Sequence, residues 1–305
     1  MKLIYEGADI LAGVSVNMCI VEMYAEKRSD RIVIRFNDPQ LRWGKWRPER
    51  GDVVELSEGP MSTGAMYVTS LEPSNGFYTL HAQAMPESMA TGTYKSWEEI
   101  KLRQLGQEVA SRHGLTYEAY GVTDRTCKYL AQRGEPDISF LQLRCQLEGC
   151  AVTVHDGKLV VYDEASMERQ APEETLKVSI DGVYEYSESQ HDVYGSCKVV
   201  GGACSGEYAD TSVGSSRVLI PPKVDLNGSD EALRFARNLL RLHNKTRCTG
   251  HMRRALMLGY APATVLRIET AKAEEWDGDV FVTQVRHDFI RNETKLWFRK
   301  PLEGY

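Results

Sequence analysis

Few features of this 305-residue sequence point to an exported, membrane-spanning or nucleic-acid-binding protein. No stretch approaches the roughly 18 consecutive apolar residues that a membrane helix needs. Residues 1–6 do not have the shape of a signal peptide, because no uncharged apolar run follows the lysine. The formal net charge is −6, whereas a dedicated nucleic-acid binder shows a dominant basic footprint. We therefore expect no membrane span and no sequence-specific nucleic-acid binding.

Familiar catalytic and metal-binding patterns are also scarce. The seven cysteines contain no Cys-x-x-Cys pair, and scattered cysteines without an export signal indicate reduced thiols in a cytoplasmic compartment. The seven histidines form no His-Glu-x-x-His or other metal spacing, and glycine-rich phosphate loops are absent. Cys145 and Cys150 would join a metal site only if distant residues converged on them. We expect no cofactor, no metal and no enzymatic activity.

The composition is that of an ordinary globular protein, with 42% hydrophobic and 26% charged residues. The length predicts about two domains. Residues 1–92 show strand patterns separated by turns, as where Ile32, Ile34 and Phe36 alternate with less apolar neighbours. Closely spaced strands of this kind predict a small antiparallel barrel or sandwich. Further strands are predicted at 53–56, 66–68 and 77–81.

One basic loop in this first segment carries two tryptophans, Trp43 and Trp46. Aromatic and basic residues together are typical of a platform on which nucleic-acid bases stack. The alternative is a loop that packs its tryptophans and solvates its charges, and the shortness of the patch favours this alternative.

Residues 93–164 predict a compact order of helix, loop, helix and hairpin. Ser96 and Glu99 match a capping box, so we expect the first helix to begin there and to end at Gly114. Its buried stripe is predicted to contain Leu102, Leu105 and Val109. A polar connector is expected to follow.

The second helix is predicted to begin near Asp137, after a proline, and to stop at Gly149. We expect Leu141 to be buried one turn into this helix. The predicted buried stripe consists of Phe140, Leu143 and Leu147. The Asp156-Gly157 pair between two apolar runs is a strong signal for a hairpin turn.

Residues 165–305 predict a second β-rich segment. Residues 163–174 are polar and acidic and are interpreted as a connector. A third helix is predicted to begin with Ser229 as its cap and to bury Leu233, Ala236 and Leu240. The expected strands cover 178–180, 184–186, 193–200, 265–268, 280–282 and 295–298.

A basic cluster follows the start of this helix, and no acidic residue occurs within 232–254. These basic residues repel one another unless acidic groups neutralise them. Acidic residues are concentrated at 163–174 and at 274–279. A solvated helix face is the simplest alternative. We nevertheless name the cluster as a candidate subunit or tube interface, in which it meets an acidic face of a neighbouring chain. Its members are Arg234, Arg237, Arg241, Lys245, Arg247, Arg253 and Arg254.

Two other hypotheses come from different classes of protein. Cys204 lies in the run Gly-Ala-Cys-Ser-Gly, which has the outline of a nucleophile elbow, so a cytoplasmic cysteine hydrolase is one alternative. An elbow needs a strand before it and a helix after it, and residues 207–216 are poor helix formers. Residues 93–163 also resemble, faintly, a LysM module that binds cell-wall peptidoglycan.

The order of weak motifs along nearly the whole chain resembles the phage late control gene D family. These motifs include residues 29–38, Asp137 with Phe140 and Leu141, the run 156–159, and the closing strand 277–287 with its valine-x-histidine. The same fold occurs in the N-terminal part of the type VI secretion spike protein. The resemblance implies an α+β, mainly β fold, in which two tail-tube-like antiparallel β-barrel domains flank a small helix-helix-hairpin α/β domain.

The resemblance also implies domain limits and a function. We expect domains at 1–92, 93–164 and 165–305, the last with a helical insertion near 228–258. The family forms the baseplate central hub of contractile tails, where a homotrimer supplies six barrels to a six-fold tail tube. The implied partners are a tail tube protein ring on one side, a separate spike protein on the other, and baseplate wedge proteins. The implied location is the virion, with assembly in the cytoplasm of the bacterial host.

Overall fold

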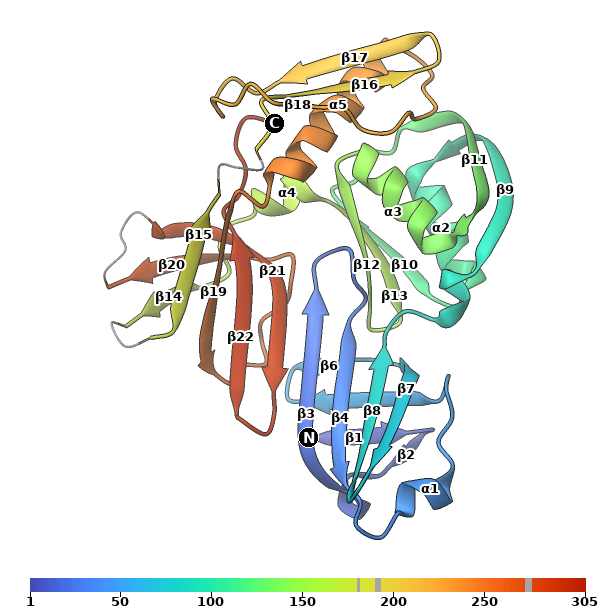
Figure 1. The fold of residues 1–305 in the computed structure, drawn as a ribbon, viewed down its shortest axis with the longest axis vertical. Coiled ribbons are helices and arrows are strands. Elements are labelled where there is room, and N and C mark those ends of the chain that lie inside the picture. The colour runs from blue at the N-terminus through green and yellow to red at the C-terminus, as the bar shows by residue number, and fades with distance from the viewer. Residues whose placement is uncertain (180–181, 190–192, 272–275) are drawn as a thin grey trace.

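The structure is a computed structural model that describes residues 1–179, 182–189, 193–271 and 276–305 (Figure 1). The first part of the chain is almost entirely β structure. Its strands are β1 (Lys2–Tyr5), β2 (Ala8–Asp9), β3 (Ser15–Tyr24), β4 (Arg31–Asn37), β5 (Val53–Glu58), β6 (Met61–Ser62), β7 (Met66–Ser74) and β8 (Phe77–Gln83). Its short helices are η1 (Leu11–Gly13), α1 (Arg42–Trp46) and η2 (Glu87–Ala90).

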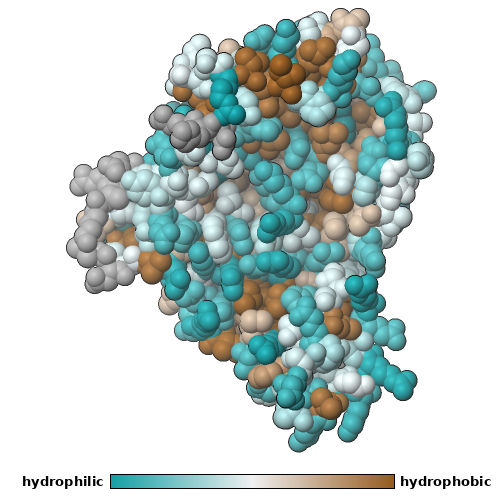
Figure 2. Space-filling view, viewed as in Figure 1, coloured by the Kyte–Doolittle hydropathy of each residue, from teal (hydrophilic) through white to brown (hydrophobic). Residues whose placement is uncertain are grey.

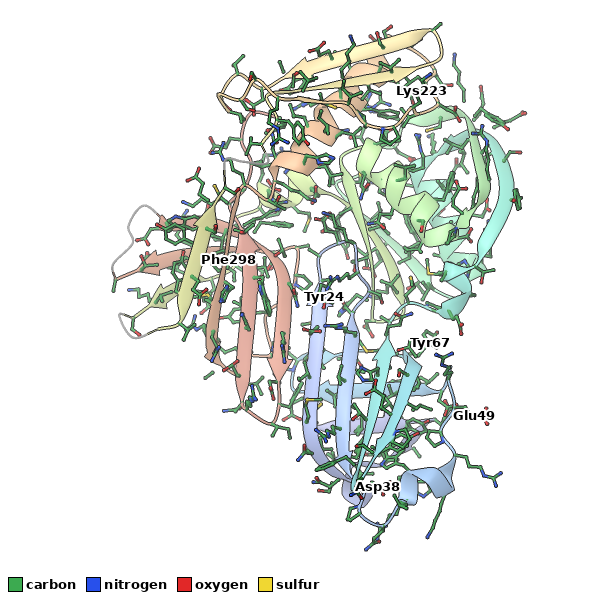
Figure 3. All side chains as sticks on the ribbon, viewed as in Figure 1. Tyr24, Asp38, Glu49, Tyr67, Lys223 and Phe298 are labelled. Atoms are coloured by element: carbon green, nitrogen blue, oxygen red, sulfur yellow. The ribbon has the colours of Figure 1, made fainter. Side chains whose placement is uncertain are left out.

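Alternating apolar residues form the core of this first unit, as predicted. Ile32, Ile34 and Phe36 of β4 are buried. Trp43 is also buried, with its ring centroid 4.4 Å from that of Phe36, while Trp46 is half-exposed. The Asp38 carboxylate accepts hydrogen bonds from the first N–H groups of α1 and holds this loop against the barrel-like unit (Figure 3). Trp43 is therefore a core residue, and the nucleic-acid platform interpretation was wrong for it.

The middle part of the chain contains more strands than predicted. Its elements are β9 (Gly92–Lys101), α2 (Leu102–Arg112), β10 (Thr116–Tyr120), β11 (Thr126–Pro136), α3 (Asp137–Leu147), β12 (Cys150–His155), β13 (Lys158–Asp163) and α4 (Glu164–Glu168). The prediction that a helix begins at Ser96 was wrong, because residues 92–101 pair with β11. This pairing buries Trp97 and Ile100, and Trp97 stacks on Phe140 at 5.4 Å. Long-range burial therefore overrides the local capping pattern.

The predicted polar connector was also wrong, since β10 and β11 occupy most of it. The second helix and the hairpin were predicted correctly. Leu141 is fully buried in α3, although Leu143 is 48% exposed and does not belong to the buried stripe. Asp156 and Gly157 both have positive φ, 47° and 68°, as a two-residue hairpin turn requires.

The last part of the chain returns to β structure around one long helix. Its elements are β14 (Thr175–Val178), β15 (Tyr184–Glu188), β16 (Ser196–Gly201), β17 (Cys204–Ala209), β18 (Val218–Leu219), α5 (Ser229–Asn244), β19 (Cys248–Ala255), β20 (Val265–Thr270), β21 (Gly278–Asp288) and β22 (Glu293–Arg299). Ile180, which was assigned to a strand, lies outside the described residues. Ser229 is the first residue of α5 and its side chain caps nothing; Leu233 is 46% exposed, whereas Ala236 and Leu240 are buried. The helical part of 228–258 ends at Asn244.

Strands β16, β17 and β18 form a separate small sheet that α5 covers. Val199, Phe235 and Leu240 pack in its core together with Leu147 at the end of α3. On the face shown in Figure 2, apolar surface gathers over this sheet and α5. The small sheet therefore joins α5 to the middle unit.

The remaining strands of the two flanking segments repeat one topology. In the first unit the strand order is β3-β4-β8-β7-β5-β1, and in the second it is β15-β19-β22-β21-β20-β14. When the two-residue strands β2 and β6 are set aside, each strand occupies the same place in the chain order of its unit. The one difference in direction is that β1 is antiparallel to β5, whereas β14 is parallel to β20. Two copies of one fold therefore lie in a single chain.

Matching irregularities support this duplication. β7 bulges against β8 between Val68 and Ser70, and β21 bulges against β22 between Val282 and Gln284. In both units the residues before the bulge pair with the equivalent strand, β5 or β20. Bulges interrupt the ladder at defined places, so a shared bulge is a specific likeness.

The two units join edge to edge. β3 of the first unit pairs antiparallel with the part of β21 that follows its bulge, from Tyr24 opposite Gln284 to Ile20 opposite Asp288. One sheet thus runs through both units, as Figure 1 shows at the centre of the molecule. The predicted α+β, mainly β class is confirmed, with two mainly antiparallel β units that flank an α/β unit.

Candidate functional site

Two members of the basic cluster are buried in an ion-pair network within the chain. Lys245 is 1% exposed, and its Nζ lies 2.5 Å from Glu26 Oε1 and 2.6 Å from Glu164 Oε1. Arg241 Nη2 lies 2.6 Å from Glu168 Oε1. Arg299 of β22 also contacts both Glu164 and Glu168. Glu164 and Glu168, which lie within the predicted connector 163–174, thus belong to α4 and neutralise this charge inside one chain.

The network is electrically balanced and joins distant parts of the chain. Glu26 follows β3, Glu164 and Glu168 lie on α4, and the three cations come from α5, the residue after it, and β22. Burial works against ionisation of Glu164, but Lys245 and Arg299 hold the pKa of this carboxyl below its ordinary value. The Arg241 N–H bonds are not aligned with Glu168, so this contact is an ion pair and not a hydrogen bond.

A second polar cluster fixes the turn after β3 against the middle unit. Tyr24, labelled in Figure 3, accepts a hydrogen bond at its carbonyl from the Thr153 hydroxyl at 3.1 Å. The Tyr162 hydroxyl donates to the carbonyl of Ala25 at 2.7 Å. Burial raises the pKa of Asp30, and His155 opposes this rise through a 2.5 Å contact. These contacts come from the predicted hairpin, which therefore supports the junction of the two β units.

The other basic residues lie nearer to the surface. Arg234 binds both carboxylate oxygens of Glu148, at 2.9 and 3.1 Å. Arg247 lies 3.7 Å from Glu188, and Arg253 lies 3.4 Å from Glu293. Arg254 Nη1 is buried without a hydrogen-bond partner in the part of the chain that the structure describes. In the second acidic patch, Glu274 and Glu275 lie outside the described residues, and Asp279 lies 2.7 Å from Arg267.

Arg237 is the most available member of the basic cluster. It is exposed on α5 and borders a groove of about 740 Å³ that Arg125 and Arg169 also line. Among the described residues, no salt bridge joins any of these three arginines to an acidic side chain. Five arginines and three acidic residues border the groove, so the groove carries mixed charge with a positive excess; the acidic residues are Glu148, Asp163 and Asp230.

The hydrolase hypothesis does not fit the surroundings of Cys204. Cys204 is the first residue of β17 and pairs with Gly201 across a tight turn, so a strand follows the thiol instead of a helix. Within the described residues, no hydrogen bond joins its sulfur to a histidine. The elbow geometry that aims a nucleophile above a sheet is therefore absent here.

The LysM hypothesis fails on topology. The middle unit contains the β9–β11 pair, and its three-stranded sheet places β10 parallel to β13. This arrangement is larger than the helix-helix-strand order on which the resemblance depended.

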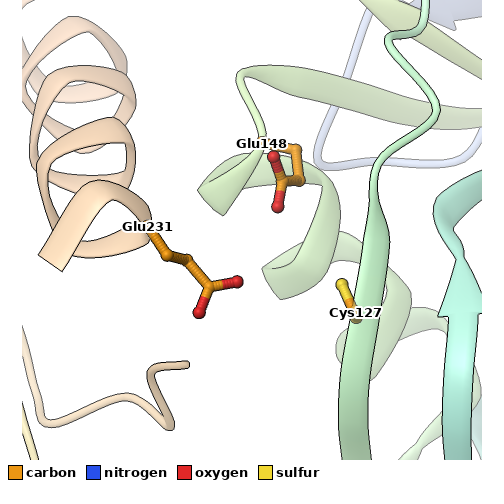
Figure 4. Close-up of side chains that lie close together, drawn as sticks. All are labelled: Cys127, Glu148 and Glu231. Carbon is orange, nitrogen blue, oxygen red and sulfur yellow. The ribbon is translucent and has the colours of Figure 1, made fainter. Parts of the chain in front are cut away.

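Distant residues do converge near one cysteine, but arginines occupy the position that a metal would need. Cys127, Glu148 and Glu231 place their ligand atoms within 4.8 Å of one another (Figure 4). Arg234 binds Glu148, and Arg144 Nη2 lies 3.1 Å from Cys127 Sγ. Burial raises the pKa of Cys127, and a thiolate is the form that binds metal. Ion pairs between the glutamates and these arginines therefore hold the cluster together, and Cys127 contributes a neutral thiol.

Burial also raises the pKa of Cys145 to about 12, so this thiol stays protonated near neutral pH. Cys145 packs as an apolar core residue.

Among the open strand edges of the described structure, those of β15 and β7 were missed by sequence reasoning. β15 has one neighbouring strand, β19, in the described structure. β7 pairs with β5 only through Met66 and Tyr67, which leaves residues 70–74 without a strand on that side among the described residues. Open edges of this kind are templates for pairing with another chain. They depend on register and topology, so no local sequence signal reveals them.

None of the helices in the described residues is both long and apolar enough to cross a membrane.

Comparison with known proteins identifies solved structures that share this fold. No family model matches the sequence, and no curated protein matches it. Among solved structures, the 43 kDa tail protein of prophage MuSo2 from Shewanella oneidensis is 12% identical, with a TM-score of 0.75 over 98% of this chain and 97% of that one. A tail protein from Neisseria meningitidis is 11% identical, with a TM-score of 0.78 over 98% and 95% of the two chains.

A third structure extends the likeness to secretion machinery. An Escherichia coli protein described as a component of the type VI secretion system, with structural similarity to T4 bacteriophage tail proteins, is 12% identical. It matches with a TM-score of 0.63 over 100% of this chain and 79% of its own. At sequence identities this low, the similarity shows the fold alone. The predicted resemblance is confirmed at that level, because the chain has the fold shared by these phage tail proteins and this type VI secretion component.

Proposed function

We propose that this chain is a structural component of a phage or phage-like contractile tail, namely the baseplate central hub that joins the tail tube to the spike. The observation that carries the proposal is the duplication: two β units of the same strand order lie in one chain that has the fold of tail proteins. A chain with two such units is suited to connect partners of different symmetry.

In this proposal the protein acts as a homotrimer. Three chains supply six similar β units, which match a six-fold tail tube protein ring. A separate spike protein binds on the other side, and baseplate wedge proteins surround the hub. The domains are 1–92, 93–164 and 165–305, and the protein is part of the virion after assembly in the host cytoplasm.

The role requires a rigid body and no chemistry. The buried network around Lys245 and the hairpin contacts to Tyr24 fix the units to one another, which supports a load-transmitting role. The exposed arginines Arg237 and Arg253 of the basic cluster are the members that we assign to a subunit or tube contact.

A complementation experiment tests the proposal. In the bacterium that carries the gene, its deletion should abolish assembled tails, and the wild-type gene should restore them. Cys204→Ala should restore them equally, because no chemistry at this thiol is needed. Normal tails without the protein would overturn the hub role. Failure of Cys204→Ala despite normal folding and incorporation would favour the hydrolase.

A further inference from the structure

One junction joins the two β units within the chain. Two open strand edges occupy the positions that correspond to this junction at the outer sides of the two units. Within the chain, β3 pairs with the part of β21 after its bulge. By the duplication, β15 corresponds to β3, and β7 corresponds to β21. We propose that β15 of one copy pairs antiparallel with residues 70–74 of β7 in the next copy, so that the same junction recurs between chains. This inference rests on the proposed trimer and deepens it.

The internal junction also defines the register. Cross-strand partners can be followed from the second residue after each bulge, which is Leu71 in β7 and Val285 in β21. The path in the first unit is Leu71, Leu80, Ile34 and Cys19, and in the second unit it is Val285, Leu296, Met252 and Tyr184. Cys19 therefore corresponds to Tyr184, and Glu22 corresponds to Ser187.

The contact between chains follows directly. Glu22 lies opposite Arg286, the third residue after the bulge of β21. The third residue after the bulge of β7 is Glu72. In the proposed junction, Ser187 of one copy therefore lies opposite Glu72 of the next, and Glu185 lies opposite Ser74.

Both edges are uncovered in the single chain, although Pro73 of β7 has no N–H to donate to a partner strand. Glu185, Ser187 and Glu188 are exposed, and so are Glu72 and Ser74. In Figure 1, β15 and β7 lie on opposite sides of the joined β units, as a head-to-tail arrangement requires. The two edges therefore cannot satisfy each other within one chain.

Charge supports this register over a neighbouring one. In the proposed register each carboxylate of Glu72 and Glu185 faces a serine, whose hydroxyl can donate a hydrogen bond to it. A shift of two residues keeps the same faces but places Glu185 opposite Glu72, and like charges directly opposite are destabilising. Within one chain, Glu188 lies 3.7 Å from Arg247, Glu72 lies 3.3 Å from His81 and Glu185 lies 3.7 Å from His251.

Engineered cysteines test the junction. The background carries Cys204→Ser and Cys248→Ser, because these two cysteines are half-exposed and the other five are buried. Into it we place Ser187→Cys with Glu72→Cys, which the proposed register brings within disulfide range. The matched control combines Ser187→Cys with Ser74→Cys, on the same strand and face but two residues away.

Mild oxidation of the purified full chain should link the first variant into reducible dimers and closed trimers. The control should link several-fold less. Sedimentation of the background protein reports the oligomeric state independently. A trimer in which the first variant does not cross-link, or in which the control cross-links better, overturns this junction and leaves the hub proposal standing. A monomer in which neither variant cross-links contradicts both.

Discussion

Lys245 is the residue on which the internal charge balance depends most. Its ammonium group is buried between Glu26 and Glu164. Removing one partner of a buried ion pair leaves an uncompensated charge in a medium of low dielectric constant. Substitution of Lys245 therefore lowers the free energy of unfolding mainly because it leaves buried carboxylates without a partner.

We expect Lys245→Met to lower the free energy of unfolding by about 3–5 kcal/mol, as measured by urea denaturation. Arg253→Met is the control, because Arg253 is about half-exposed beside Glu293 and such surface pairs contribute about 0–1 kcal/mol. Equal effects of the two substitutions would mean that the buried network does not hold these units together.

His287 makes the fold sensitive to acid. Its ring is fully buried in β21, where Nδ1 lies 2.9 Å from the Thr294 hydroxyl. Burial lowers the pKa of His287 to about 4. In the unfolded chain the pKa is about 6.5, so below this pH the unfolded state binds a proton that the folded state does not. The stability from the neutral ring is therefore present above pH 6.5 and is lost as the pH falls toward 4.

We expect the wild type to lose about 2 kcal/mol of unfolding free energy between pH 7 and pH 5 from this group. His287→Gln, which has no titrating ring, should lose correspondingly less over the same range. Urea denaturation of both proteins at the two pH values measures the difference. Parallel losses would show that His287 does not titrate differently in the two states.

At the scale of elements, α3 offers a test with an internal control. Leu141 is fully buried in the core, whereas Leu143, two residues later, is 48% exposed to solvent. We expect Leu141→Asp to cost several kcal/mol, because it buries an unpaired charge, and Leu143→Asp to cost little. Thermal unfolding of the two variants checks this. Similar melting temperatures would show that the helix faces another way.

Elements whose residues interact locally could be predicted from the sequence. The turn at Asp156-Gly157, the start of α3 at Asp137 and the alternation in β4 all follow from nearby residues. The segment 96–101 could not, because its local capping pattern competes with pairing to β11, some 30 residues away. Local propensity decides an element only where tertiary contacts do not oppose it.

The same limit applied to the candidate site. The run of basic residues was visible, but the sequence did not show that Arg241 and Lys245 face Glu164 and Glu168. A signal was nevertheless present: each pair is spaced by four residues, which places both members on one helix face. The open edges of β7 and β15 had no such signal, since they arise only when the register of the whole sheet is known.

At the scale of the whole molecule, Arg237 tests the proposed outer contact. It borders a groove together with Arg125 and Arg169, and none of these three arginines forms a salt bridge with a described acidic side chain. We expect Arg237→Glu to keep the unfolding free energy within about 0.5 kcal/mol but to weaken assembly, more strongly at low salt. Arg291→Glu, on the exposed turn between β21 and β22, is the control. Sedimentation across a salt series measures the effect, and assembly equal to wild type at every ionic strength would make Arg237 only a solvated side chain.

The central claim is that repeated β units assemble into one ring. The most direct measurement is electron microscopy of the purified protein together with its mass in solution. The account predicts particles with three-fold symmetry, six similar β units around a ring, and a mass three times 34.4 kDa. Monomers alone across the micromolar range, even with the spike protein present, would contradict it.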